Sequence, residues 1–196
     1  KVAVIGGGWA GLAAAVELGA AGADVSVFES AKQLGGRARS TDVHGHTLDN
    51  GQHILIGAYR ETLRLMEIVG ANPERQLKRL PLELNYPGAG FRMTLPRLPA
   101  PFHLAVGLLG AKGSSLGEKI AAVRFMRFLQ ARDYRLAADC TVAEMLDRHQ
   151  QQGKLRRYLW EPLCLAALNT APVQASAQIF ANVLRDSLGG NRADTD

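Results

Sequence analysis

The sequence contains little cysteine, few aromatic residues and no long apolar run. Only two of its 196 residues are cysteine, Cys140 and Cys164, and 6% are aromatic. Two cysteines are too few for a disulfide framework and lack the spacing of metal ligands, so we expect two buried thiols in a reducing cytoplasm and no metal site. The most apolar stretch, residues 99–111, is shorter than the roughly 20 residues that a membrane-spanning helix needs.

Runs of like charge are absent as well. The net charge is +5, but the arginines are scattered along the chain and the aromatic motifs of RNA-binding proteins are missing. We therefore expect no binding to nucleic acid. With 47% apolar and 21% charged residues, the composition is that of a globular protein. No signal peptide precedes the first predicted strand, which favours a cytoplasmic location.

A glycine-rich segment follows a short apolar run at the start of the chain. Val2–Ile5 is rich in β-branched residues, which is typical of a buried parallel strand. The next stretch, "GGGWAGLAAAVELGAAG", fits the pattern G-x-G-x-x-G and predicts a helix over residues 9–21. The N-terminus of such a helix directs free N–H groups and a positive dipole end at a phosphate. The predicted phosphate contacts are Gly6, Gly8, Trp9, Ala10 and Gly11.

An acidic residue follows at the position where dinucleotide-binding folds recognise a ribose. Glu29 ends the second predicted strand, "DVSVFE", and lies 23 residues after Gly6. A carboxylate there accepts hydrogen bonds from a ribose diol and repels a 2′-phosphate. We therefore predict a dinucleotide whose adenosine ribose carries no phosphate, held in part by Glu29 and Ser30.

A second glycine loop comes directly after this acid, in the stretch "ESAKQLGGRARST". Gly35 and Gly36 let the backbone come close to a ligand without side-chain obstruction. Arg37 beside them offers a planar guanidinium suited to phosphate. An NAD enzyme normally continues from its second strand into a helix and a third strand, so this second set of contacts favours a longer cofactor, FAD.

The fingerprint, the acid and the "GGR" that follows resemble the amine-oxidase and phytoene-desaturase superfamily of flavoproteins, whose cofactor is FAD. Two later stretches, "LDNGQHILIGAY" at residues 48–59 and "LWEPLCLAALNT" at residues 159–170, are similar to the squalene-associated FAD-dependent desaturases, or hydroxysqualene dehydroxylases, of bacterial hopanoid synthesis. The resemblance implies that four residues lie at the isoalloxazine end of FAD, with Asp49 and His53 as candidate catalytic acids. These four residues are Asp49, Gly51, Gln52 and His53.

The same resemblance implies an FAD-dependent oxidoreductase that acts on an isoprenoid lipid. The expected reaction is reductive dehydroxylation of hydroxysqualene to squalene, in which reduced flavin delivers hydride to an allylic carbon as the hydroxyl leaves. A carotenoid or phytoene-type desaturase and an amine oxidase-like flavoenzyme remain alternatives, because the same cofactor motifs serve all of them. The direction of the reaction is therefore open.

The length of the chain leaves a further alternative open. Family members are much longer and return to the FAD domain at their C-terminus with another glycine and acid motif, which this sequence does not contain. We expect the chain to be the N-terminal part of a larger enzyme. The alternative outside the enzyme class is an inactive fragment or a non-catalytic nucleotide-binding module.

The predicted fold class is α/β, with a Rossmann-like FAD-binding βαβ unit in residues 1–80 and a mostly helical α+β partial substrate domain in residues 81–196. The sheet formed by this chain alone is expected to be incomplete, with an exposed edge through which a homo-oligomer could form. In the second part, patterns of turn residues, caps and apolar spacing predict a hairpin and four helices. These are a hairpin at 82–95 and helices at 116–136, 141–152, 154–170 and 176–188.

Three local signals refine these helices. Thr141 with Glu144, and Ser176, are typical N-terminal caps, and Pro162 is expected to kink or divide its helix. Arg97 and Lys112 flank an apolar stretch, as they would in an interfacial membrane anchor. That stretch therefore has several interpretations: a lid, a buried connection or amphipathic helix, or a peripheral contact with the inner face of a bacterial membrane.

Overall fold

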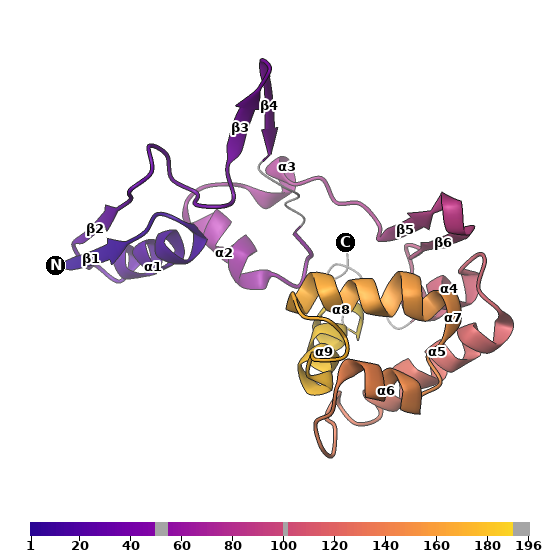
Figure 1. Cartoon of the computed structure of the whole chain (residues 1–196). Helices are drawn as coiled ribbons and strands as arrows, with labels where there is room; N and C mark the ends of the chain where they lie inside the picture. Colours follow the sequence, from indigo (N-terminus) through magenta and orange to yellow (C-terminus); the bar gives the residue numbers. More distant parts are fainter. Residues whose placement is uncertain (50–54, 100–101, 190–196) are drawn as a thin grey trace. The chain divides into compact units, whose positions relative to one another are not determined.

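The structure is a computed structural model that describes residues 1–49, 55–99 and 102–189. The chain divides into two compact units (Figure 1). The first unit comprises Lys1–Leu55 and Tyr59–Lys78, and the second comprises Ile56–Ala58 and Arg79–Asp196. Helices and small two-stranded sheets occur in both units, so the fold mixes α and β structure.

The first unit begins with a strand, a helix and a second strand that pairs with the first in parallel. These elements are β1 (Val2–Ile5), α1 (Trp9–Ala20) and β2 (Val25–Phe28). A parallel pair needs a crossover, and α1 supplies it while packing against both strands. The register places Val2 opposite Val25 and Ile5 opposite Phe28.

A hairpin and two helices complete the described part of the first unit. They are β3 (Ser40–Val43), β4 (His46–Asp49), α2 (Arg60–Ile68) and α3 (Pro73–Gln76). The turn between β3 and β4 consists of His44 and Gly45, both of which have positive φ angles. Two successive left-handed residues give the backbone twist that a tight antiparallel hairpin requires.

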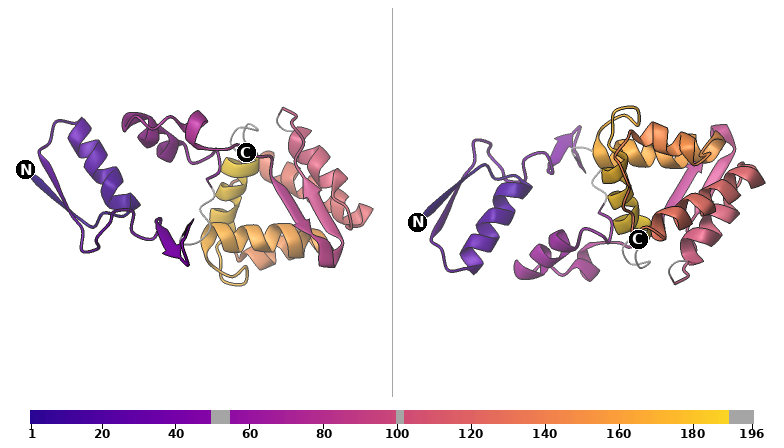
Figure 2. Two further views of the ribbon diagram at one scale, coloured as in Figure 1. Left: turned by 90° about the horizontal axis from the view of Figure 1, so that it is seen from above. Right: turned by 90° about the horizontal axis from the view of Figure 1, so that it is seen from below.

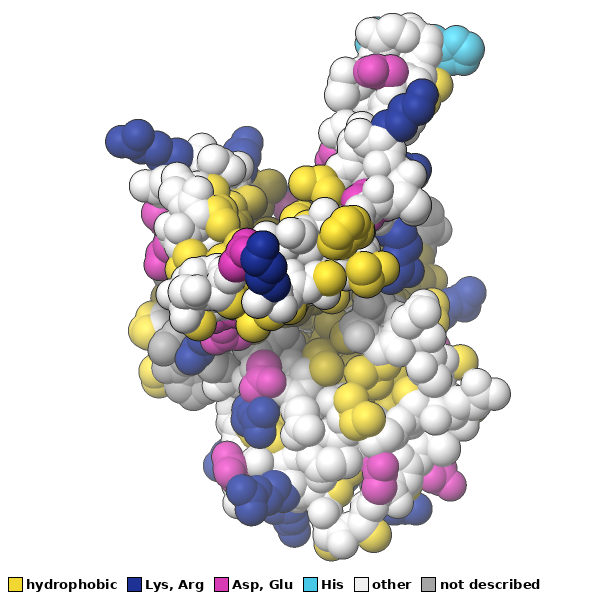
Figure 3. All heavy atoms as spheres, turned by 90° about the vertical axis from the view of Figure 1, so that its left-hand side faces the viewer, with side chains coloured by type: hydrophobic (Ala, Val, Ile, Leu, Met, Phe, Trp, Pro, Cys, Tyr) yellow, Lys and Arg dark blue, Asp and Glu magenta, His cyan; other side chains and the backbone are white. Residues whose placement is uncertain are grey.

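The strand β1 is less buried than its sequence predicts. Val2 and Val4 are half-buried, whereas Ile5 is 80% exposed. Parallel strands are buried on both sides only when both faces of the sheet are covered, and α1 is the helix of the described residues that packs on β1 and β2. Figure 3 shows apolar side chains exposed among charged ones on one side of the molecule.

The second unit consists of one hairpin and a set of helices. Its hairpin joins β5 (Glu83–Tyr86) to β6 (Phe91–Thr94) through a 3₁₀ turn, η1 (Pro87–Ala89), and lies within the predicted range. The helix that follows packs against β6, as the two views of Figure 2 show. The helical segments are α4 (Phe102–Gly110), α5 (Leu116–Gln130), α6 (Val142–Arg148), α7 (Gly153–Leu155), η2 (Arg156–Trp160), α8 (Glu161–Leu168), α9 (Ala177–Leu184) and η3 (Arg185–Gly189).

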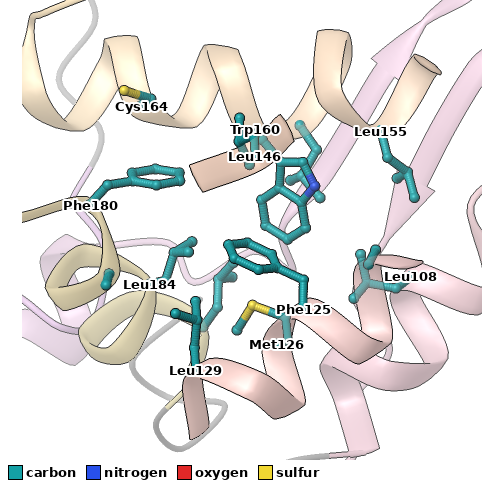
Figure 4. Close-up of a cluster of buried hydrophobic side chains, with 14 of the residues drawn as sticks. Leu108, Phe125, Met126, Leu129, Leu146, Leu155, Trp160, Cys164, Phe180 and Leu184 are labelled. Atoms are coloured by element: carbon teal, nitrogen blue, oxygen red, sulfur yellow. The ribbon is translucent and has the colours of Figure 1, made fainter. Parts of the chain in front are cut away.

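The second unit has a continuous apolar core. Figure 4 shows side chains from several of its helices pointing toward one another around Trp160 and Phe125. Their rings meet edge to face, with centroids 5.6 Å apart. The indole Nε1 of Trp160 donates a hydrogen bond to Oε1 of the buried Gln151 at 2.9 Å, so the polar atom of the core tryptophan is satisfied.

Two helices end earlier than their sequences predict. The helix expected to reach residue 136 ends at Gln130, because Asp133 and Tyr134 adopt left-handed φ angles and the N–H of Tyr134 turns back to the carbonyl of Leu129. The helix expected over 141–152 ends at Arg148. The chain reverses at Gln150, which has φ +56°, and the next helix starts at Gly153.

The predicted helix caps and Pro162 lie at or near the starts of helices. Thr141 and Glu144 form a reciprocal capping box, and the hydroxyl of Ser176 accepts the N–H of Ile179 at 3.1 Å. Residues expected in one helix over 154–170 form α7, a π-helical turn and α8 in sequence, with Pro162 in the first turn of α8. A proline is tolerated there because it has no N–H to leave unpaired.

Candidate cofactor site

A hollow in the first unit brings the two glycine loops together. Its volume is about 730 Å³, within the usual range for small-molecule sites. Eight of its ten lining residues are predicted cofactor contacts, and the other two are Ile5 and Ala38. The eight are Gly6, Gly8, Trp9, Ala10, Gly11, Gly35, Gly36 and Arg37.

The first loop is shaped by backbone constraints that only glycine meets. Gly6 has φ +97°, a conformation that side chains rarely allow. A Cβ on Gly11 would lie 1.8 Å from the carbonyl oxygen of Gly6, so α1 can lie this close to the turn only with glycine there. Gly8 is the N-cap of α1 and supplies no side-chain cap, so the N–H groups of the first turn are available to a ligand.

The second loop packs directly on the first. The N–H of Gly35 donates to the carbonyl of Gly7 at 2.8 Å, and a Cβ on Gly36 would lie 3.1 Å from the Cα of Gly8. Both Gly35 and Gly36 have positive φ angles. The sequence interpretation gave this glycine pair the task of approaching a ligand. The structure adds a second task, the close contact of one loop backbone with the other.

The carboxylate of Glu29 ties the end of β2 to the first loop. One oxygen accepts the N–H of Gly7 at 2.7 Å, and the other accepts the N–H of Ala31 at 2.8 Å and the hydroxyl of Ser30 at 3.3 Å. The backbone N–H groups of Ala31 and then Gly7 lower the pKa of Glu29, so the group is ionised at neutral pH. An ionised carboxylate has about four acceptor positions, which leaves capacity for a ribose hydroxyl.

Gly7 is a site residue that the sequence reasoning missed. It is buried, and a Cβ there would lie 2.4 Å from Cδ2 of Leu34 and 3.3 Å from Cβ of Glu29. The signal in the sequence was the middle glycine of "GGG", a position at which the fingerprint G-x-G-x-x-G does not require glycine. Only the fold reveals that Leu34 and Glu29 close over it.

The structure does not bring every predicted site residue to this hollow. Ser30 is exposed and contacts Glu29 rather than the hollow. Asp49 is exposed at the end of β4, paired with Ser40 in the hairpin. Gly51, Gln52 and His53 lie outside the described residues. The described geometry therefore concerns the nucleotide end of a cofactor and not its flavin end.

The residues of the hollow fit the adenosine diphosphate half of FAD. A pyrophosphate needs backbone N–H groups at a helix N-terminus and a nearby cation, which the first turn of α1 and the exposed Arg37 provide. A side chain on Gly11 or Gly36 would meet neighbouring backbone and separate the elements that form the hollow. The ionised Glu29 beside the loop has the chemistry that a ribose diol requires.

Comparison with known proteins identifies relatives along nearly the whole chain. A hydroxysqualene dehydroxylase of Rhodopseudomonas palustris is 32% identical over 195 residues, which cover 95% of this chain and 43% of that protein. One from Sinorhizobium fredii is 30% identical over 191 residues, with 96% and 44% covered. A zeta-carotene desaturase of Synechocystis is 40% identical over 79 residues, 40% of this chain and 16% of that protein. The chain spans less than half the length of these relatives.

Among solved structures, putrescine oxidase bound to putrescine matches with a TM-score of 0.58 and 19% identity, covering 97% of this chain and 42% of that one. This likeness concerns the fold alone. The family model described as flavin containing amine oxidoreductase matches residues 9–191. The match confirms the predicted cofactor, FAD, and the predicted class, an FAD-dependent oxidoreductase. The chain belongs to the family of flavin-containing amine oxidoreductases.

Proposed function

We propose that the protein acts on an isoprenoid lipid and takes part in the reductive dehydroxylation of hydroxysqualene to squalene. The observation that carries the proposal is the extent of the match. The two hydroxysqualene dehydroxylases align with 95% and 96% of the chain, and so with residues of both units. The cofactor motifs alone, which lie in the first unit, do not distinguish this reaction from others in the family.

In this proposal residues 1–80 hold the cofactor in a Rossmann-like βαβ unit, and residues 81–196 contribute to the substrate domain. The first turn of α1 and Arg37 bind the pyrophosphate, and Glu29 accepts hydrogen bonds from the ribose. Gly7, Gly35 and Gly36 keep the two loops in contact. FAD supplies hydride transfer when it is bound.

The chemistry that remains for the protein is to protonate a leaving group and to exclude water. Replacement of a hydroxyl by hydrogen consumes one hydride and one proton and releases water. Asp49 and His53 are the proposed proton donors, by resemblance to the family. Asp49 is exposed in the first unit, so the proposal requires that substrate or another segment cover it. A His53→Ala variant that turns over hydroxysqualene at the unchanged rate would remove His53 as a donor.

The first test is the visible absorption spectrum of the purified protein, before and after FAD is added and free flavin is removed by desalting. Retained flavin bands would show that the two loops are sufficient to hold FAD. Incubation with reduced flavin and hydroxysqualene, followed by product analysis, then tests the reaction. Squalene is the expected product. A colourless protein would favour the alternative of an inactive fragment or a non-catalytic nucleotide-binding module.

A second candidate function rests on a specific observation, the 40% identity to a zeta-carotene desaturase over 79 residues. Such an enzyme removes hydrogen from its substrate, so the flavin would work in the oxidising direction. Incubation of the FAD-loaded protein with phytoene or zeta-carotene would give a more unsaturated product in that case. Turnover of these substrates without turnover of hydroxysqualene would overturn the first proposal.

A further inference from the structure

The second unit exposes an apolar surface on α4 and the beginning of α5, which we call the α4–α5 surface. The two helices follow one another in the chain and pack against each other (Figures 1 and 2). The surface has six large apolar side chains, each between 37% and 69% exposed. They are Leu98, Phe102, Val106, Leu109, Leu116 and Ile120.

Helical spacing gathers these side chains on one face of each helix. Phe102, Val106 and Leu109 are four and three residues apart, which places them on one face of α4. Residues on the opposite face of α4, among them Leu104 and Leu108, are buried in the core of the second unit. Leu116 and Ile120 are likewise four apart on the exposed face of α5.

The inner face of α4 is tightly fixed. A Cβ on Gly107 would lie 2.3 Å from Cδ2 of Leu95, so the helix lies against the end of β6 with no room to rotate its outer face inward. A helix that is apolar all round is normally buried on every side. The outer face of α4 is therefore an apolar surface that lacks a partner among the described residues.

The segment that carries this surface is rich in cations. Residues 97–127 contain five of them and one carboxylate. The carboxylate, Glu118, is half-buried and accepts the N–H groups of Lys154 at 2.8 Å and Leu155 at 3.3 Å. None of the cations forms an ion pair with another described residue. They are Arg97, Lys112, Lys119, Arg124 and Arg127.

We propose that the α4–α5 surface docks onto a lipid bilayer that contains anionic lipid. The apolar side chains would enter the boundary between headgroups and acyl chains, and the cations would contact the headgroups. A second copy of the chain fits this surface poorly, because a symmetric contact would bring the same cations face to face. Among the described residues, no helix is long and apolar enough to cross a membrane.

Docking does not require bound flavin, so it can be tested apart from the proposed reaction. Purified protein is mixed with vesicles of phosphatidylcholine alone or of phosphatidylcholine with phosphatidylglycerol, and bound protein is separated by flotation at low and at high salt. We expect binding to the anionic vesicles that weakens as salt rises. Protein that stays with the soluble fraction under every condition would overturn the proposal.

A matched pair of variants locates the contact. The double variant Phe102→Ser/Leu109→Ser removes two exposed side chains of the surface, and Leu165→Ser/Ile179→Ser removes two of similar exposure elsewhere in the same unit. The first should lower the vesicle partition coefficient at least about tenfold, since each apolar side chain adds to interfacial binding. The second should leave it unchanged. Equal binding by both variants would show that attraction is electrostatic only and would overturn the proposal.

Two further measurements keep the result interpretable if the double variant fails to fold. Circular dichroism reports its helix content, and Phe102→Trp serves as a second, conservative variant. Its additional tryptophan emission should shift to the blue on anionic vesicles and be quenched by brominated lipid. No shift would overturn the proposal. Light scattering tests whether a second copy of the chain covers this surface. The proposal would also be overturned if the wild type were a dimer that the double variant Phe102→Ser/Leu109→Ser dissociates, and if the wild type did not bind vesicles.

Discussion

Trp160, Phe125 and Phe180 of the second unit are at most 1% exposed, whereas Ile5 and Phe28 of the first unit are 80% and 57% exposed. Among the described residues, every large apolar side chain that is buried belongs to the second unit. The second unit therefore has the core that stabilises an independent fold. The first unit is organised by backbone contacts between glycine loops and by one carboxylate.

The difference indicates that the two units are held together by different interactions. Burial of apolar side chains makes the second unit sensitive to cavities. The first unit holds its loops through positive φ angles and close backbone contacts, which contribute specificity for a ligand but little buried apolar area. We expect a ligand in the hollow to add to the stability of the first unit, because binding to the native state alone always stabilises it.

The largest effect should come from a cavity in the core of the second unit. Trp160→Ala removes a fully buried ring and leaves the side chain of Gln151 without its indole partner. The free energy of unfolding should fall by about 3–5 kcal/mol. Phe28→Ala in the first unit is the control and should change it by about 0.5 kcal/mol or less. Urea unfolding followed by circular dichroism measures both, and equal losses would contradict the contrast between the units.

In the first unit, substitution of a glycine that supports the hollow should affect FAD binding more than stability. Gly11→Ala places a methyl group 1.8 Å from the carbonyl oxygen of Gly6, whereas Gly19→Ala in the same helix meets nothing within 4 Å. We expect Gly11→Ala to weaken FAD binding at least about tenfold, since it separates α1 from the turn that supports the phosphate. Gly19→Ala should keep the affinity and stabilise the helix by about 0.5–1 kcal/mol. Flavin fluorescence titration measures the affinity.

If Gly11→Ala binds FAD as tightly as the wild type, the hollow is not the phosphate site. Thermal unfolding of both variants separates a local effect from loss of structure. A Gly11→Ala protein that keeps the wild-type unfolding transition and loses FAD would support the assignment most directly.

Hydrogen exchange with and without FAD should sharpen the comparison further. At a free FAD concentration of 100 times Kd, binding stabilises the native state by about 2.7 kcal/mol. Amides of residues 2–38 should gain protection, because both loops and the strands that carry them line or support the hollow. Amides in α5 and α6 should exchange at unchanged rates. Protection confined to the second unit would place the cofactor elsewhere.

Local signals in the sequence predicted the residues of the two glycine loops and one helix start, but not the contrast in burial between the units. The glycine fingerprint, Glu29 and the capping pair Thr141 and Glu144 are local signals with fixed spacing, and the structure places these residues in one loop system and at one helix start. The exposure of Ile5 was not predicted. A β-branched run specifies a strand, but only the elements that pack on it decide how far it is buried.

The features that sequence reasoning missed depend on contacts between distant residues. Tyr134 takes a left-handed φ angle without being glycine, and its carbonyl accepts the side-chain amide of Gln178, 44 residues away. No local pattern marks such a residue, so the end of α5 was placed too late. Gly7 is similar, since the need for glycine there arises from Leu34 closing over it.

The smallest effect we predict is a pH dependence of the second unit that the first does not share. His149 lies against the rings of Phe125 and Phe128, at centroid distances of 5.3 and 4.1 Å. Burial lowers the pKa of His149, and Arg132 and Arg148 lower it further, because each disfavours the charged imidazolium.

Since the pKa of His149 is lower in the folded state than in the unfolded state, the unfolded state binds the proton first. The contribution of neutral His149 to stability is therefore complete above the pKa of about 6.5 that the histidine has in the unfolded state. This contribution is lost as the pH falls through the pKa that His149 has in the folded state. In His149→Gln, the free energy of unfolding of the second unit should depend less on pH between about pH 7 and pH 5. Urea unfolding at a series of pH values measures it. The variant and the wild type should lose stability in parallel below that range, where carboxylates such as Glu29 and Glu144, whose pKa values are lowered by backbone N–H groups, begin to protonate. An unchanged slope between pH 7 and pH 5 in His149→Gln would show that protonation of this histidine costs the second unit nothing, and that its aromatic packing tolerates the charge.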